Sequence, residues 1–454
     1  MADDERERRE WLTRRELLRR AGLGTAVLLY SGAAPKTAVA GAMKYAHQEA
    51  KHTLKIIQWR HFVPAYDTWF DNVYTKVWGQ HNDTDVIVDH INLTDLPARA
   101  ASEVAARSGH DLFQHLSPPS SYEDQVISLK DIVTDVTQKL GPMKGVSRRS
   151  AYNPKTKKWF GWPDNYVPDP VHYRKDWWGE VGYKPTTWDA VLKAAPKLKG
   201  NGHPIGIGMN NELDSNMALI ALMQCFGAYI QDEHANVTLN TKATRDAVSY
   251  MANLYKRGMT SEIFAWQPAS NNNAMLAGRI SLAVNAISIL RTAEQQNPAL
   301  ARNLAILPVP KGPKQRLGLE HVMGVYVIWK FSAQKALAKK FLRDQQLAYT
   351  GHFLNSKFYN FPGWPGAVKN IKKRLAKDPS GKYVILDSIS QHATANVGFP
   401  GYSNAAIDEL FNAGLIPQMF AEVAQDKKSA AESVRDTAGE ARRIFRKWRA
   451  KGKI

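Results

Sequence analysis

Two periods of hydrophobic and polar positions alternate along the chain after residue 50. Residues 54–59, 85–91 and 111–115 are short runs rich in Leu, Ile, Val and Phe, and such runs predict strands. Between them, residues 66–80 and 95–107 repeat apolar side chains at helical spacing, which predicts helices. Strands that alternate with helices in this way build a parallel sheet, so the pattern predicts a βαβαβ unit.

The alternation of predicted strands and helices continues through the rest of the chain. Further strands are predicted at residues 171–173, 205–209, 280–284 and 322–329. Further helices are predicted at residues 188–199, at the apolar run 217–226, and at 332–347 with Ser332 as its cap. A last helix is indicated by 4-3-4-3 spacing of Val434, Ala438, Ala441, Phe445 and Trp448. The fold class predicted from these elements is α/β.

Composition narrows the class of protein. With 454 residues, 44% of them hydrophobic and 23% charged, the chain resembles an ordinary globular protein of two or three packed units. The single cysteine, Cys225, can form no disulfide within the chain. The net charge of +19 is spread along the chain without any nucleic-acid-binding motif, which favours a generally basic surface over nucleic-acid binding.

The first 40 residues have the order of a secretory signal. A charged stretch to Arg20 precedes an apolar stretch at 21–34, which is too short to span a bilayer and contains three glycines. Residues 13–19, TRRELLR, resemble the twin-arginine export motif. Ala38-Val39-Ala40 then offers small residues to a signal peptidase, which predicts a mature start near Gly41 outside the cytoplasmic membrane. Lipid attachment is not indicated.

Catalytic signatures are missing from the sequence. It contains no GxSxG, HExxH, GxxxxGK[ST] or GxGxxG motif, and its 13 histidines form no pair with metal-ligand spacing. The sequence therefore predicts no catalytic residue, no metal site and no cofactor, and it gives no positive evidence for an enzyme.

Four segments together resemble the family 1 extracellular solute-binding proteins of bacterial ABC importers, the group that contains the maltodextrin-binding proteins. The most specific is 171–189, VHYRKDWWGEVGYKPTTWD, which is similar to a "YNKDLFEKAG…PPTTWDEL" stretch of that family. Residues 273–282, residues 307–312 (LPVPKG) with the helix that follows, and 416–420 (IPQMF) come in the family's order. The resemblance covers nearly all of the chain after the predicted signal.

The resemblance implies a fold and a way of working. It implies a two-lobed clamshell of the type II periplasmic-binding-protein class, with discontinuous lobes joined by crossing hinge segments. Lobe one is expected at 53–165 and 286–330, and lobe two at 166–285 and 331–454. A solute that touches both lobes stabilises their closed arrangement, which the membrane permease then recognises. The resemblance further implies a monomer that works without covalent chemistry.

The expected solute is a sugar or polyol. Such ligands present apolar C–H faces and a rim of hydroxyls, so they suit aromatic rings next to planar donors and acceptors. The candidate residues lie at strand ends and at the expected crossing segments: Trp59, Arg60, His61, Phe62, Gln114, His115, Asn165, Tyr166, Asn210, Asn211, Asn285, Ser288, Phe361 and Trp364. Asn271, Asn272 and Asn273 are expected chiefly to cap a short helix before Met275.

Two alternatives stay open at this point. Arg60 could form a fork for a carboxylate or phosphate, so the same clamshell could take an anionic or metal-containing solute. A secreted enzyme that acts on polysaccharides is the weaker alternative. Trp59 and Trp364 could also serve core packing rather than solute stacking, and Asn210-Asn211 could simply form a turn.

Overall fold

The structure is a computed structural model that describes residues 50–454. The predicted export signal at residues 1–40 lies outside these described residues. Residues 50–53 and 72–86 belong to one compact unit, and residues 54–71 and 87–454 form another. Helices and strands alternate along both, so the predicted α/β class is confirmed.

The larger sheet has seven strands in the order β11-β6-β10-β3-β1-β2, with β12 paired to β10. β1 runs parallel to β3, as the sequence predicts, whereas β10 is antiparallel to both β3 and β6. The strands are β1 (His52–Trp59), β2 (Thr84–Ile91), β3 (Leu112–His115), β6 (Trp162–Pro168), β10 (Gly318–Val327), β11 (Phe361–Pro362) and β12 (Thr394–Ala395).

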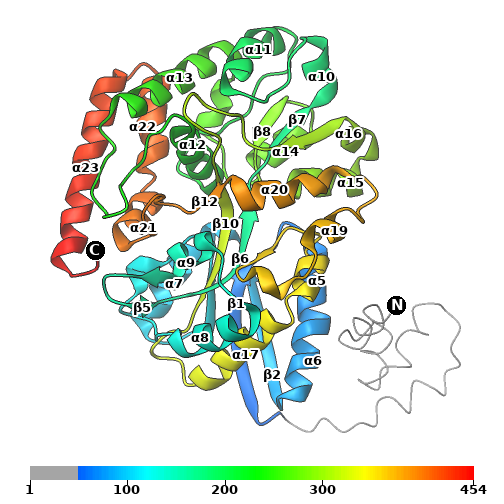
Figure 1. The fold of residues 1–454 in the computed structure, drawn as a ribbon, viewed down its shortest axis with the longest axis vertical. Helices are drawn as coiled ribbons and strands as arrows, with labels where there is room; N and C mark the ends of the chain where they lie inside the picture. Colours follow the sequence, from blue (N-terminus) through cyan, green and yellow to red (C-terminus); the bar gives the residue numbers. More distant parts are fainter. Residues whose placement is uncertain (1–49) are drawn as a thin grey trace, which may run out of the picture. The chain divides into compact units, whose positions relative to one another are not determined.

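A smaller sheet has the order β8-β7-β9, with β7 (Val171–Arg174) antiparallel to both β8 (Leu282–Val284) and β9 (Leu304–Leu307). β4 (Tyr152–Asn153) and β5 (Lys158–Trp159) form a separate hairpin. Figure 1 shows α10, α11 and α13 near the smaller sheet, and α8, α9 and α17 near the larger one.

Helices fill most of the remaining chain. In the first half they are α5 (Pro64–Trp69), a π-helical stretch (Phe70–Tyr74), α6 (Thr75–His81), α7 (Leu96–Ala106), α8 (Lys130–Leu140), α9 (Gly145–Ala151), α10 (Lys175–Glu180), α11 (Trp188–Gly200) and α12 (Leu213–Cys225). In the second half they are α13 (Lys242–Gly258), α14 (Ser270–Leu276), α15 (Ser288–Gln296), α16 (Pro298–Asn303), α17 (Lys335–Leu347), α18 (Thr350–Asn355), α19 (Ile371–Leu375), α20 (Ile385–His392), α21 (Ala405–Asn412), α22 (Leu415–Ala424) and α23 (Ala430–Ala450).

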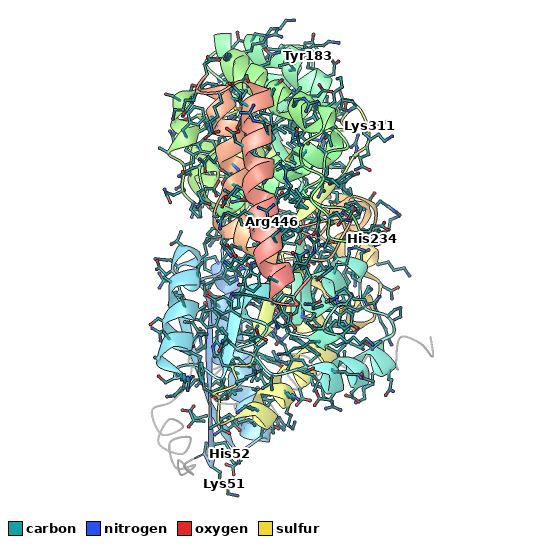
Figure 2. All side chains as sticks on the ribbon, turned by 90° about the vertical axis from the view of Figure 1, so that its left-hand side faces the viewer. Lys51, His52, Tyr183, His234, Lys311 and Arg446 are labelled. Atoms are coloured by element: carbon teal, nitrogen blue, oxygen red, sulfur yellow. The ribbon has the colours of Figure 1, made fainter. Side chains whose placement is uncertain are left out.

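Two helices show how the hydrophobic pattern fixes their place. α12 is apolar on every face and almost wholly buried, and the Glu212 side chain caps its start by accepting from the N–H groups of Asp214 and Ser215. α23 is amphipathic: the five residues predicted at 4-3-4-3 spacing are buried. Arg446 lies on its exposed side (Figure 2).

The structure corrects three local predictions. Residues 205–209 do not form a strand; Ile205 makes only an isolated bridge to Leu282, and a side chain at Gly206 would collide with Trp266 and Ile280. Ser332 precedes α17 instead of capping it: the N-cap is Gln334, whose N–H donates to Ser332 Oγ at 3.1 Å, while that Oγ donates to Asp111 Oδ1 at 2.6 Å. The N-cap of α14 is Ala269, so the asparagines that follow lie inside the helix.

Two short segments cross between the sheets. Asp169 and Pro170 lead from β6 directly into β7, and residues 308–317 lead from β9 back into β10. The predicted lobe boundaries stay a prediction, but two pairings differ from them in detail. β9, from the 286–330 segment, belongs to the smaller sheet, and α17, from the 331–454 segment, packs on α8 and β6 beside the larger one.

No helix within residues 50–454 has the length and apolarity that crossing a membrane requires.

Candidate functional site

The carboxyl ends of β1, β3 and β6 meet at one edge of the larger sheet. Ile57 pairs with Phe113, while Val325 pairs with His115 and Gly324 with Asn165. Because β1 and β3 are parallel and β10 runs antiparallel to both β3 and β6, these three strands end on the same side. The edge where ligands of α/β sheets gather therefore carries the candidates that follow each strand.

An aromatic wall, defined here as Trp59, His61, Phe62 and Tyr359, stands at the end of β1. The ring centroids of Trp59 and His61 are 4.8 Å apart, and those of Trp59 and Phe62 are 5.1 Å apart. Tyr359 comes from a distant part of the chain and lies 4.8 Å from His61 and 6.1 Å from Trp59. This wall offers several ring faces and edges within a few ångströms of one another.

Hydrogen bonds fix the orientation of the His61 ring. The N–H of Val63 donates to Nδ1 at 2.9 Å, so Nε2 carries the proton and donates to Asn360 Oδ1 at 3.2 Å. Burial lowers the pKa of His61 to about 4. The imidazole is therefore a neutral donor near pH 7, suited to hydroxyls rather than to anions.

A carboxamide cluster, defined here as Asp214, Asn271, Asn272, Asn285 and Ser288, lies on the side of the smaller sheet. Asn271 Nδ2 donates to Asp214 Oδ2 at 2.8 Å, and Asn285 Nδ2 donates to Asn271 Oδ1 at 2.9 Å. Asn272 Nδ2 donates to Ser288 Oγ at 3.0 Å. All five side chains are buried, and Asn285 Oδ1 has no hydrogen-bond partner among the described residues.

Four elements bring this cluster together. Asp214 lies in the first turn of α12, and Asn271 and Asn272 lie in α14. Asn285 follows β8 directly, with its N–H bonded to Pro170 O at 3.2 Å, and Ser288 begins α15. The cluster is thus attached to the first crossing segment.

Tyr359 lies close to the segment that carries the carboxamide cluster. Arg291, one turn after Ser288, donates through Nε to the backbone oxygen of Lys357, two residues before Tyr359, at 3.1 Å. Burial raises the pKa of the Tyr359 phenol, and the carboxylates of Asp214 and Asp169 raise it further. Its oxygen is fully buried without a hydrogen-bond partner among the described residues. A buried hydroxyl of this kind is costly unless a partner such as a water or a ligand group satisfies it.

The remaining edge candidates lie beside the aromatic wall. Tyr166 and Phe361 face each other across β6 and β11, with ring centroids 5.9 Å apart. Asn165 Nδ2 donates to Asp164 Oδ2 at 2.8 Å, and burial raises the pKa of Asp164 to about 7. All four of these side chains are buried.

On β3, His115 packs 4.8 Å from Phe113 and 5.6 Å from Tyr122, and burial lowers its pKa to about 3. Gln114 is buried opposite Tyr326. Arg60 is exposed.

Three predicted residues lie apart from this edge. Trp364 packs 4.7 Å from Trp162, which begins β6, and its Nε1 donates to Thr137 Oγ1 at 3.0 Å. Asn210 Nδ2 donates to Trp266 O at 2.8 Å, and Asn211 is exposed. These contacts agree with the packing and turn alternatives that the sequence left open.

Sequence reasoning missed Asp214, Tyr359 and Asn360. A carboxylate in the first turn of a mostly apolar, buried helix is a signal that could have identified Asp214. The aromatic run Phe358-Tyr359-Asn360-Phe361 is a weaker signal for the other two, because nothing in it indicates which β-strand it approaches.

Other features of the described residues do not compete with this site. A surface hollow of about 460 Å³ is lined by Ser128, Lys130, Asp131 and Thr134 and has no aromatic lining. No group of His, Cys, Asp and Glu between residues 50 and 454 has the geometry of a metal site. The buried side chains at the sheet edge pack against one another.

Comparison with known proteins yields a family and a set of structures. A family model described as bacterial extracellular solute-binding protein matches residues 66–343. No curated protein matches the chain.

Among solved structures, maltose-bound MalE3 of T. maritima is 15% identical, with 87% of this chain and 100% of that chain covered and a TM-score of 0.74. A solute-binding protein of Thermotoga lettingae bound with alpha-D-tagatose is 17% identical, with 87% and 100% covered and a TM-score of 0.73. A sugar transporter of Arthrobacter chlorophenolicus with laminaribiose is 14% identical, with 86% and 99% covered and a TM-score of 0.73. The fold is therefore that of two-lobed periplasmic binding proteins.

Proposed function

Because this chain belongs to the family of bacterial extracellular solute-binding proteins, we propose that it captures a neutral sugar or polyol for an ABC importer. The observation that carries the proposal is the approach of the aromatic wall to the carboxamide cluster beside the edge of the larger sheet. Rings cover the C–H faces of a sugar, and carboxamides both donate to and accept from its hydroxyls.

The two sides of the site would be carried by separate lobes. We assign the larger sheet with α8 and α17 to lobe one, and the smaller sheet with α10 to α16 to lobe two. Asp169–Pro170 and residues 308–317 then act as hinge segments, because they are the short connections between the sheets. A solute bound to both sides stabilises the closed arrangement by its differential affinity for it.

A neutral solute agrees with the charges at the site. His61 and His115 are neutral near pH 7 because burial lowers the pKa of each, and Arg60 is exposed rather than directed into the buried layer. The maltose, tagatose and laminaribiose in the similar structures support the same class. The anionic solute that Arg60 suggested is therefore the weaker alternative.

Export and delivery complete the proposal. The twin-arginine-like signal at residues 13–19 would place the folded protein outside the cytoplasmic membrane. There a monomer would pass its solute to the permease subunits of the importer. No catalytic step is involved.

A thermal-shift screen tests the proposed solute class. The protein is unfolded and refolded to remove carried-over solute, then mixed with maltose, laminaribiose, tagatose, neutral polyols, sugar acids and phosphorylated polyols. A solute that binds only the native state stabilises it by about 2.7 kcal/mol when its concentration is a hundred times Kd. This stabilisation raises the melting temperature. We expect a shift with one neutral class only.

Trp59→Ala and Trp364→Ala form a matched pair for this screen. Both remove a buried indole, but only Trp59 stands in the aromatic wall. We expect Trp59→Ala to abolish the solute-induced shift, and Trp364→Ala to lower the starting melting temperature while keeping the shift. Shifts with anionic solutes alone, lost in Arg60→Ala, would overturn the neutral class.

A further inference from the structure

Arg291 lies one turn after Ser288 in α15, on the side of the carboxamide cluster, yet its contacts are with the other side of the site. Its Nε donates to the backbone oxygen of Lys357 at 3.1 Å, and its guanidinium lies 5.4 Å from the ring of Phe358. Lys357 and Phe358 immediately precede Tyr359 and therefore connect Arg291 to the aromatic wall.

The backbone at this turn is held by local hydrogen bonds, from the N–H of Phe358 to Phe353 O at 3.0 Å and from the N–H of Lys357 to Leu354 O at 3.1 Å, and by a contact from α15. Lys357 and Phe358 have φ values of 55° and 69°, so two successive residues with side chains occupy the left-handed region. That conformation is unfavourable for residues other than glycine and persists only where surrounding contacts hold it. The hydrogen bond from Arg291 to Lys357 O is one such contact, made from α15.

The guanidinium is itself held in place on several sides. It lies 3.5 Å above the ring of Tyr383, and its Nη1 is 2.9 Å from Glu294 Oε2 and 3.0 Å from Asp378 Oδ2. Tyr383 Oη donates to the same Glu294 oxygen at 2.8 Å. The Arg291 side chain is only 12% exposed, so these charge-assisted bonds are shielded from water and stronger than surface pairs.

Asp378 is ionised in this arrangement. Burial alone would raise the pKa of its carboxyl, but hydrogen bonds from Ser380 and Arg291 hold the pKa below its usual range. The pair thus joins a cation of α15 to an anion between α19 and the turn at Lys382.

The partners of Arg291 divide between the two sides. Arg291 and Glu294 belong to α15, which connects two strands of the smaller sheet. Lys357 and Asp378 flank β11, which pairs with β6 in the larger sheet. The α18 helix just before Lys357 is tied to α5 through the hydrogen bond between His352 Nδ1 and Tyr66 Oη, 2.9 Å long.

We propose that Arg291 is a positioning residue that joins the two sides of the solute site and holds the 357–358 turn so that Tyr359 faces the carboxamide cluster. This inference rests on the proposed function, because it takes the meeting of these two sides as the solute site. Separation of the sides would break the hydrogen bond to Lys357 O, the pair with Asp378 and the stacking on Tyr383 together. Arg291 therefore favours the closed arrangement before any solute binds.

Distance measurement between two spin labels tests this without any solute. In the full chain, the buried Cys225 is replaced by Ala, and cysteines are introduced at the exposed Gln138 of α8 and Lys193 of α11. Pulsed electron–electron double resonance then measures the distance between the two labels, which reports the separation of the two sides. Arg291→Gln should raise the population at longer distances at least about threefold over the labelled parent.

Three variants separate positioning from general stability. Asp378→Asn should shift the distances in the same direction but less, and Arg291→Lys should fall between parent and Gln, because lysine keeps the charge but not the fork. Arg257→Gln, an exposed arginine of α13, serves as the matched control and should change nothing. A lower melting temperature with an unchanged distance distribution in both Arg291→Gln and Asp378→Asn would overturn the proposal.

The distance readout is independent of the solute class. If the thermal-shift screen finds no neutral sugar, the proposed function loses its support while the spin-label result still stands or falls on the geometry of Arg291. If the distances do not respond to Arg291→Gln, positioning by Arg291 is wrong and the sugar proposal is unaffected.

Discussion

The aromatic wall and the carboxamide cluster form the two sides of one site, and they are built in different ways. The carboxamide cluster is held by hydrogen bonds among its own side chains, such as those of Asn285 with Asn271 and of Asn272 with Ser288. The aromatic wall has few hydrogen bonds of its own. Its Tyr359 is presented by a turn that receives support from Arg291 on the opposite side.

The difference separates two tasks. A network of planar amides fixes donor and acceptor directions in advance and so selects the hydroxyl pattern of a solute. Rings at strand ends supply contact area, and their approach to the amides depends on closure. Specificity would therefore come from the carboxamide cluster, and the coupling of binding to closure from the aromatic wall.

The largest effect is expected from breaking the carboxamide cluster at its centre. Asn285→Leu removes the donor to Asn271 Oδ1 and leaves buried polar groups unpaired, each at a cost of about 1–3 kcal/mol. We expect the free energy of unfolding to fall by about 3 kcal/mol in urea titration. A loss of less than about 0.5 kcal/mol would mean that the cluster is not a connected network.

The next effect concerns pH and the aromatic wall. Burial lowers the pKa of His61 from 6.5 to about 4, so the unfolded chain binds a proton that the folded chain does not between those values. Because of His61, the free energy of unfolding therefore falls by on the order of 2 kcal/mol as pH falls from about 6.5 to 4. The free energy of unfolding of His61→Gln should fall less over this window than that of the wild type.

An equal pH dependence of the free energy of unfolding in the wild type and in His61→Gln would contradict this account.

The smallest effect is expected at the edge of the carboxamide cluster. Ser288→Ala removes the acceptor for Asn272 Nδ2, but Asn272 Oδ1 still accepts from Asn285 Nδ2 at 2.5 Å. We expect a loss of about 1 kcal/mol in thermal unfolding. A loss as large as that of Asn285→Leu would show that the cluster is anchored at Ser288 rather than at Asn285.

The parts of the fold and of the site that the sequence predicts are those that depend on interactions between residues close in the chain or on the order of the strands. Periodicity identifies β1 and β3, and a parallel pair brings Trp59, His61 and His115 to one edge. Asn285 and Ser288 come together because β8 leads directly into α15. These placements depend on local pattern and on the topology of the sheet, and both are present in the sequence.

The failures come from contacts between distant segments. Tyr359 lies beside His61 in a chain where β11 pairs with β6 and Arg291 contacts the preceding turn, and neither contact has a local signature. Residues 205–209 have strand composition, but the close approach of Trp266 to Gly206 leaves room for only an isolated bridge. Trp364 resembles a pocket residue in sequence and packs on Trp162 instead.

The central claim is that the solute lies between these two sides. The most direct measurement is a crystal structure of the protein grown with whichever neutral sugar gives the largest thermal shift. The account predicts the sugar ring against Trp59 and Tyr359, with its hydroxyls bonded to Asn285 and its neighbours. Sugar density only at another place, such as the hollow beside Lys130, would contradict it.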